Sequence, residues 1–306
     1  MKPVEEAFAS ETFRRVVLPG IVLAIGVHPL LTTWTPSIDA VYGVGSTVLL
    51  VTEIVLFGLM VSSATQWIYY VYEGFRLKVV TAAAGRANVK RLQNLIKLST
   101  ELEAKPIRSE DEENQLSKAY EALLDFPAHK LGTGAVERYT ERPTRLGNII
   151  AVYELYAETR YGFDGVFYWF HLLSFGPEQA RQDFAEQYGF AESLVLTSFS
   201  GVLVAVLHAL VLIGFAIGSL FPHFVIVSLQ TGPKTSFVIL LAGIAVWWLF
   251  YMAALPAHRE AGRIFQSMVD IAMPDFTDWI NKIKAPLDQP VIDLLKKLHK
   301  HLAELS

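Results

Sequence analysis

The hydrophobic pattern of this chain is dominated by four long apolar stretches. Each is long enough to cross the hydrocarbon core of a bilayer as a helix, which takes about 20 mostly apolar residues. The segments between them carry too many charges to do the same. The pattern therefore predicts a membrane protein with four transmembrane helices, at residues 16–35, 44–68, 193–221 and 236–255.

Positive charges are sorted to one side of these predicted spans. The connection at residues 36–43 holds no Lys or Arg, and the connection at residues 222–235 holds only Lys234. Because short loops rich in Lys and Arg stay on the cytoplasmic side, both termini and the middle of the chain are predicted to be cytoplasmic. The predicted parts are an N-terminal segment (1–15), a first transmembrane hairpin (16–68), a cytoplasmic helical domain (69–192), a second hairpin (193–255) and C-terminal cytoplasmic helices (256–306).

The segment between spans two and three has helical periodicity, so the predicted fold class is all-α. Span two is expected to continue into the cytoplasm as one long helix, followed by a charged loop and a helix at residues 115–124. Thr144 can cap a further helix, which Gly162 interrupts. Pro177 is expected to start the helix that continues into span three.

The segment after Pro256 has the pattern of an amphipathic helix, at residues 259–273. Because proline interrupts helices, this helix is expected to be separate from span four. A short basic helix with Lys296, Lys297 and Lys300 follows near the C-terminus. Its charge is suited to contact anionic membrane lipid.

Composition removes several classes of function. The chain is 52 % hydrophobic and 18 % charged, against about 25 % charged residues in ordinary soluble domains. A net charge of -4 gives no reason to expect nucleic acid as a partner. The absence of cysteine excludes thiol nucleophiles and cysteine-ligated metals. No phosphate-binding loop, H-E-x-x-H or G-x-S-x-G motif is present. We therefore expect that the protein is not an enzyme and that it binds no cofactor or metal ion.

Three ionisable residues fall within the predicted spans at similar depths. Glu53 lies in the otherwise apolar run of span two, His28 in span one and His208 in span three. A charged group at the bilayer centre costs about 2.5–3.5 kcal/mol, so Glu53 must be neutral, paired or in contact with water. Two interpretations remain open: these residues border an ion or proton path, or Glu53 ties two helices together by bonding to a histidine or a hydroxyl group.

Small residues at a spacing of four mark predicted helix contacts in span three. Gly214 and Gly218 form a G-x-x-x-G motif, and Gly201 and Ala205 form a second small pair. Small side chains let membrane helices approach closely. We expect close packing at these positions, either within one chain or between subunits.

A block in the middle of the chain carries a resemblance to a known family. The run Pro143 to Asn148, Glu154, the run Arg160 to Gly162 with Asp164, and Trp169 together resemble a block in a family of uncharacterised bacterial multi-pass membrane proteins. The resemblance covers about a tenth of the chain and departs after the tryptophan, where Phe170 and His171 replace an expected proline and arginine. It implies a bacterial inner membrane location and no particular activity.

The predicted layout also resembles that of bestrophin-type anion channels, without their pore motifs. We therefore expect a homo-oligomeric pore or ion channel whose path is bordered by Glu53, His208 and His28. The alternative is a membrane-anchored receptor or scaffold that docks a cytosolic protein, with a membrane-damaging defence effector as a variant. The apolar run at residues 166–175 favours this alternative, whose docking residues would be Arg145, Asn148, Glu154, Arg160, Asp164 and Trp169.

Overall fold

The computed structural model describes residues 13–31, 46–76, 78–131, 135–139, 141–220 and 232–284. Within these ranges the chain is almost entirely helical, as predicted, with one small antiparallel hairpin that the sequence pattern had not indicated. The predicted basic helix at Lys297 lies outside them. The elements are η1 (Phe13–Val17), α2 (Leu18–Leu31), α4 (Ser46–Ser63), α5 (Thr65–Tyr72), α6 (Lys78–Glu103), α7 (Glu110–Leu123), β1 (Ala128–Leu131), β2 (Ala135–Tyr139), α8 (Arg145–Glu154), α9 (Tyr156–Tyr161), α10 (Trp169–Phe175), α11 (Glu178–Leu220) and α12 (Pro233–Lys284).

Among the described residues, three helices are long and apolar enough to cross a membrane. They are the continuous η1 and α2, then α11, then α12. A fourth candidate exists only if α4 and α5 are taken together, because these two helices are bent by 61° at the break around Ala64. The apolar helices mark the chain as a membrane protein, but the second predicted span is not a straight helix.

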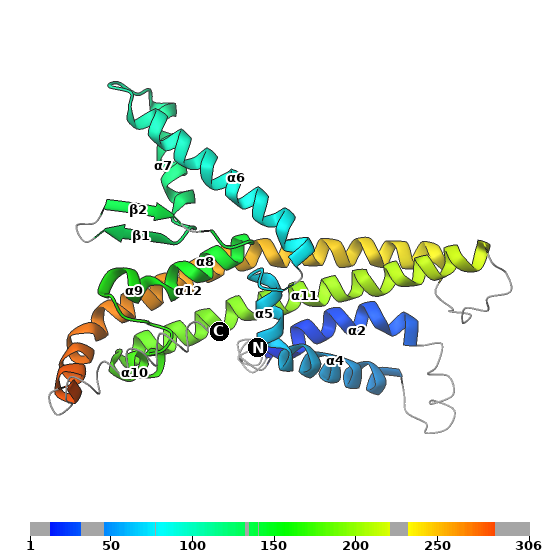
Figure 1. Cartoon of the computed structure of the whole chain (residues 1–306). Helices are drawn as coiled ribbons and strands as arrows, with labels where there is room; N and C mark the ends of the chain where they lie inside the picture. Colours follow the sequence, from blue (N-terminus) through cyan, green and yellow to red (C-terminus); the bar gives the residue numbers. More distant parts are fainter. Residues whose placement is uncertain are drawn as a thin grey trace.

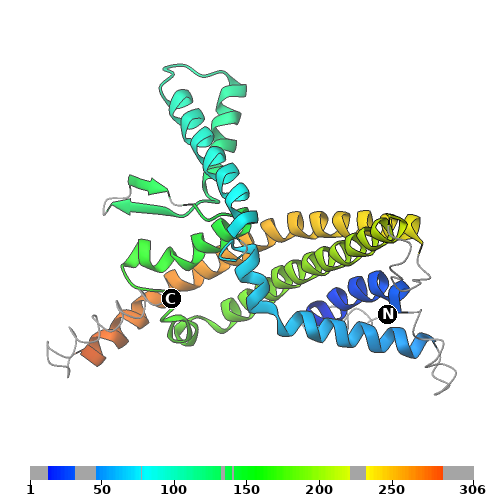
Figure 2. The ribbon, with the colours of Figure 1, turned by 45° about the vertical axis from the view of Figure 1, so that its right-hand side comes forward.

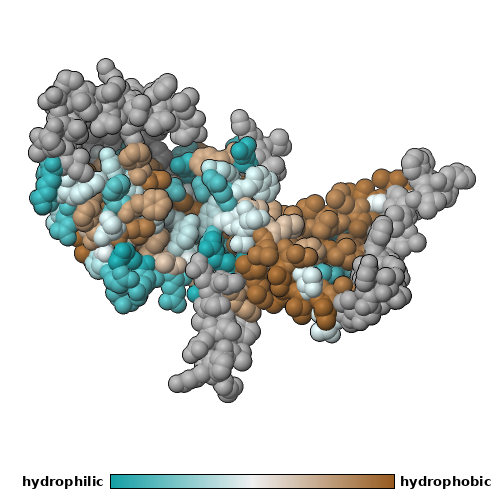
Figure 3. Space-filling model, turned by 90° about the horizontal axis from the view of Figure 1, so that it is seen from below, coloured by the Kyte–Doolittle hydropathy of each residue, from teal (hydrophilic) through white to brown (hydrophobic). Residues whose placement is uncertain are grey.

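The apolar parts of these helices form an open row in the order α4, α2, α11 and α12 (Figures 1 and 2). Each helix packs on its neighbour, and α4 and α12 lie at opposite edges of the row. Apolar side chains remain exposed on both edges, for example Leu56 on α4 and Trp248 on α12. Figure 3 shows the resulting hydrophobic surface, which covers this end of the molecule. We call it the membrane part: residues 13–31, 46–72, 193–220 and 232–255.

Two glycines bring α4 against the η1–α2 helix. A Cβ atom on Gly20 would lie 2.0 Å from the carbonyl oxygen of Ile54, and one on Gly58 would lie 2.0 Å from the carbonyl oxygen of Val16. Neither distance is compatible with a side chain. The two helix backbones therefore touch at two points, a contact that the sequence analysis did not identify.

Glycine also sets the crossing of α11 and α12. A Cβ on Gly201 would lie 2.8 Å from the carbonyl oxygen of Gly243, and one on Gly243 would lie 2.9 Å from the backbone nitrogen of Ala205. The small pair Gly201 and Ala205 thus lies at a contact within the chain. Gly214 is half-buried, and a Cβ on Gly218 would meet nothing within 4 Å among the described residues.

Helix α12 runs unbroken from the membrane part into the polar part of the chain, so the predicted separation at Pro256 is wrong. The helix also continues through Pro274. A proline inside a helix costs about 3 kcal/mol. Here the neighbours of Pro256 compensate this cost, because Ala254, Leu255 and Ala257 are all buried and hold this stretch of helix against the rest of the chain.

The expected continuous helix from span two to the polar segment is also wrong. After the bend around Ala64, α5 ends at Tyr72 and the chain turns at Gly74, whose φ of +94° is a left-handed conformation that favours glycine. Pro143 packs directly against this glycine. Helix α6 therefore starts in a new direction, and it leads away from the membrane part (Figure 1).

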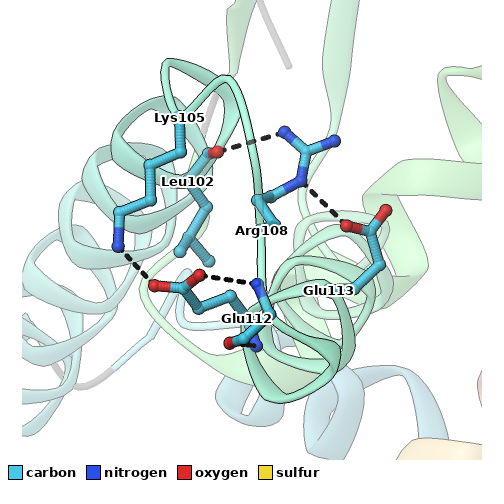
Figure 4. Close-up of polar contacts among 6 residues, drawn as sticks. Leu102, Lys105, Arg108, Glu112 and Glu113 are labelled. Carbon is cyan, nitrogen blue, oxygen red and sulfur yellow. Dashed lines mark hydrogen bonds and ion pairs between the residues drawn. The ribbon is translucent and has the colours of Figure 1, made fainter.

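We call the polar part of the chain the head: the described residues within 78–192 and 256–284. Helices α6 and α7 form an arm that projects from it (Figure 2). Helix α7 begins earlier than predicted because Ser109 and Glu112 form a capping box. Figure 4 shows this turn, where Lys105 pairs with Glu112 and Arg108 pairs with Glu113. The predicted charged loop is thus largely a helix start.

The remaining helices of the head, α8, α9 and α10, pack along α12. The N-cap predicted at Thr144 is confirmed, because its hydroxyl accepts a hydrogen bond from the Gly147 nitrogen at the start of α8. Gly162 ends α9 with a left-handed φ of +76°, also as predicted. Helix α11 begins directly after Pro177 and continues into the membrane part.

Candidate ion site

One carboxyl group and one imidazole meet inside the membrane part. The Nδ1 atom of His28 on α2 lies 2.9 Å from Oε2 of Glu53 on α4. The His28 side chain is 27 % exposed and the Glu53 side chain 13 % exposed on the surface of the chain. The pair therefore lies at the flank of the α2–α4 hairpin rather than sealed within it.

The third residue predicted for this site, His208, does not join the pair. Its Nε2 atom donates to the carbonyl oxygen of Gly26 at 2.8 Å, and its side chain is fully buried. His208 therefore ties α11 to α2, next to the close contact of Gly26 with Val204.

The His28–Glu53 pair can hold a proton in two ways. The two groups can share one hydrogen as a carboxylate with an imidazolium, or as a neutral acid with a neutral imidazole. Both arrangements keep the pair uncharged overall, which lowers the cost of placing it among apolar groups. Such a pair presents a carboxyl oxygen and a ring nitrogen as hydrogen-bonding groups within the membrane part.

A second polar cluster lies at the other end of the membrane part, where no polar site was predicted from the sequence. Tyr69 and His258 form a buried hydrogen bond of 3.1 Å between α5 and α12. Tyr72 bonds to Ser198 on α11 at 2.8 Å. These bonds fasten the bent helix α5 across the α11–α12 pair. An ion pair of 2.9 Å between Arg15 and Glu192 fastens the start of the first helix to α11.

Acidic side chains are crowded where α5 ends. The pKa of Glu73 is raised to about 7, chiefly by burial and also by the nearby Glu154, while Arg142 acts to lower it. The pKa of Glu154 is also raised, chiefly by burial. Glu154 was predicted as a docking residue. The structure instead places it in this half-buried cluster, close to Arg142, Glu73 and Asp164.

Stability is expected to depend on the protonation of Glu73. Because its pKa is raised from 4.5 to about 7, its contribution is fully present below about pH 4.5 and is lost as the pH rises through 7. Glu73→Gln keeps the neutral form at every pH. We expect this variant to be more stable than the wild type by about 2 kcal/mol above pH 7, after allowing for partial exposure, and equally stable near pH 4.5.

Thermal unfolding in detergent at several pH values between about 4.5 and 8 measures this difference. Glu101→Gln is the matched control, since the Glu101 side chain is 61 % exposed on α6. A stability difference between Glu73→Gln and the wild type that does not change with pH would contradict the assignment.

Two of the predicted docking residues pack in or against the chain's own core. Asn148 is 1 % exposed, and its side-chain oxygen accepts a hydrogen bond from the Arg142 nitrogen. The half-buried ring of Trp169 packs on Phe184 and Phe265, with centroids 5.2 and 5.0 Å away. The Asn148 side chain is therefore used inside the fold, and a docking role for Trp169 stays a prediction.

The other predicted docking residues have separate surroundings. Asp164 accepts hydrogen bonds from the backbone nitrogens of Val166 and Phe167 and so shapes the turn before α10. Arg160 bonds to the Tyr161 side chain at the surface. Arg145 begins α8 near Arg91, and burial lowers its pKa. These residues do not form one continuous site.

Within the described ranges, no three His, Cys, Asp or Glu side chains are placed to hold a metal ion together. Comparison with known protein families, with curated proteins and with solved structures gave no match.

Proposed function

We propose that the chain is a subunit of a homo-oligomeric pore in a bacterial inner membrane, with a polar path past the His28–Glu53 pair. In this proposal α4 and α5 together form a bent fourth span, so that both termini and the head lie in the cytoplasm. The charge distribution supports this orientation, since Lys234 is the only Lys or Arg in the two connections predicted to be external.

The observation that carries the proposal is the partial exposure of the pair. An ionised carboxylate that faced lipid would cost about 2.5–3.5 kcal/mol, and even a neutral polar pair is costly there, whereas Glu53 is 13 % exposed and His28 27 % exposed on the hairpin flank. A polar environment on that side removes this cost. An open row of four helices encloses no interior of its own, so neighbouring copies would have to complete a water-filled path.

Exposed apolar surface on both edges of the row supports assembly. The candidate spans are poorly covered by their own chain, with 17 % of the apolar window of α11 and 17 % of that of α12 buried. Membrane helices pack through small residues and shape complementarity. Gly218 on α11 has open space beside it among the described residues and offers one such surface to a second copy.

Replacing Glu53 with glutamine tests the proposal directly. Purified protein in planar bilayers or proteoliposomes should conduct protons or small cations, and Glu53→Gln should change the conductance or the ion preference severalfold, because the proton-exchanging group is lost. Thr52→Val is a matched control on the same helix, since the Thr52 hydroxyl donates to the Val48 carbonyl oxygen one turn earlier in α4. Bilayers that never conduct, or equal currents in wild type and Glu53→Gln, would exclude the pore.

A scaffold that docks a cytosolic protein is the second candidate. Three apolar side chains on the head are exposed next to one another in the sequence: Val166 by 59 %, Phe167 by 58 % and Phe170 by 80 %. Trp169, which the sequence pattern suggested for this role, is packed inward. The two candidates differ in their need for Glu53, because a scaffold works with glutamine at this position and the proposed pore does not.

A further inference from the structure

A cavity of about 550 Å³ lies in the head, where the arm meets α12. Helices α6, α7, α8 and α12 all contribute to its wall. Its volume is within the range of about 300–1,000 Å³ that is typical of sites for small molecules. It lies far along the chain from the His28–Glu53 pair and has no part in the proposed pore.

The wall of this cavity has an excess of positive charge. Four cationic side chains line it, namely Arg91, Lys118, Arg259 and Arg263, against the two acids Glu121 and Asp125. Asp125 is paired with two arginines, at 3.2 Å from Arg91 and 2.5 Å from Arg259. Arg263 pairs at 3.4 Å with Glu260, which does not line the cavity. The wall itself therefore carries more cationic than acidic side chains.

Two guanidinium groups beside the cavity have unused hydrogen-bond donors. The Nη1 atom of Arg91 and the Nε atom of Arg145 are buried and have no hydrogen-bond partner among the described residues. Burial and the charge of Arg91 lower the pKa of Arg145, which places these two cations close together. Arginine donors of this kind are suited to the oxygens of a phosphate group.

The wall of the cavity also has apolar residues. They are Ile149 and Val152 on α8, Leu124 at the end of α7 and the ring of Tyr153. A ligand that uses the whole wall has a charged group and an apolar or aromatic group. A bare inorganic ion would leave the apolar residues without a contact.

We propose that this cavity binds a phosphate-bearing anion with an organic part, such as a nucleotide or the headgroup of an anionic lipid. The phosphate oxygens contact Arg91, Lys118 and Arg263, and the organic part lies against α8. Arg91 belongs to the arm and Arg263 to α12. A bound anion thus joins the arm to the helix that continues into the membrane part.

The double variant Lys118→Gln with Arg263→Gln tests this site without touching the Asp125 ion pairs. Both side chains line the cavity, and that of Arg263 is 72 % exposed, so the fold should not need them. The full chain in neutral detergent is titrated with ATP and with inorganic pyrophosphate by calorimetry. The wild type should bind at least one of them, ATP more tightly than pyrophosphate, and the double variant at least about tenfold more weakly.

The matched control is Arg86→Gln with Lys97→Gln, which removes the same charge from the exposed surface of α6 outside the cavity. It should bind as the wild type does. For the lipid source, native mass spectrometry after reconstitution with phosphatidylglycerol should show lipid retained by the wild type and by the control but lost from the double variant.

The two measurements distinguish a soluble nucleotide from a lipid headgroup. ATP binding that depends on Lys118 and Arg263 assigns a soluble ligand, and lipid retention with the same dependence assigns a headgroup. If no probe binds, or if both double variants weaken binding equally, the site is refuted. None of these measurements needs conduction, so the failure of the pore and the failure of this site are distinguishable.

Discussion

Replacing Gly58 with alanine is expected to force α4 away from the first helix and to destabilise the protein by about 2–3 kcal/mol. The new Cβ would lie 2.0 Å from the carbonyl oxygen of Val16. That oxygen belongs to a helix backbone and cannot swing aside as a flexible side chain could. The helices must therefore separate, and the 2.9 Å contact of His28 with Glu53 should lengthen as a result.

Denaturation in mixed micelles, followed by tryptophan fluorescence, measures the loss of stability. Gly85→Ala on α6 is the control, because a Cβ there would lie 3.8 Å from Pro143, an ordinary van der Waals contact, and it should not destabilise the protein. If Gly58→Ala is as stable as Gly85→Ala, the close approach of the first two helices does not exist as described.

Removing the charge of Asp125 should cause a comparable or larger loss, of about 3–5 kcal/mol. The Asp125 side chain is 1 % exposed and binds Arg91 on α6 and Arg259 on α12. Without the carboxylate, two partly buried guanidinium groups face each other with no acid between them. Asp125→Asn retains the shape of the side chain, so the effect reports on charge and hydrogen bonding rather than on a cavity.

The expected first consequence of Asp125→Asn is that the arm comes loose from α12. Hydrogen exchange should therefore rise in α6 and α7 more than in the membrane part, together with a lower unfolding temperature. Glu101→Gln removes the same charge from an exposed pair with Lys97 at 3.7 Å and should change stability by less than about 0.5 kcal/mol. Equal protection of the arm in both variants would show that Asp125 does not hold it.

The sequence predicts the apolar helices well because their signal is length and composition, which do not depend on neighbours. It predicts the bend around Ala64 poorly, since no proline or glycine lies at that break. The bend depends instead on tertiary bonds of α5, from Tyr69 to His258 and from Tyr72 to Ser198. Long-range bonds of this kind leave no local pattern.

The candidate ion site could be predicted only in part, because the sequence gives the depth of a residue in a helix but not the direction of its side chain. Depth along a helix follows from residue position, so Glu53, His28 and His208 could be assigned to one layer. The direction in which each side chain points depends on how the helices are rotated about their axes, which one sequence does not determine. His208 consequently faces the Gly26 carbonyl oxygen, while His28 reaches the carboxyl group.

In the head, the start of α7 was predicted too late although the sequence carries a local signal for it. Ser109 and Glu112 have the spacing of a capping box, and they start α7 where the charge run suggested a loop. The position of Asn148 had no such signal, because a polar residue that fills the core looks the same in sequence as one that contacts a partner. Burial alone separates the two.

Helix α11 has 43 residues without a proline, which corresponds to a rod of about 64 Å. It lies close against α12 at Gly201 and Gly243, roughly midway along its length. On either side of this point it is bonded to the first helix, from Glu192 to Arg15 and from His208 to the Gly26 carbonyl oxygen. A displacement of its head end would therefore move the first helix with it, without any change of secondary structure.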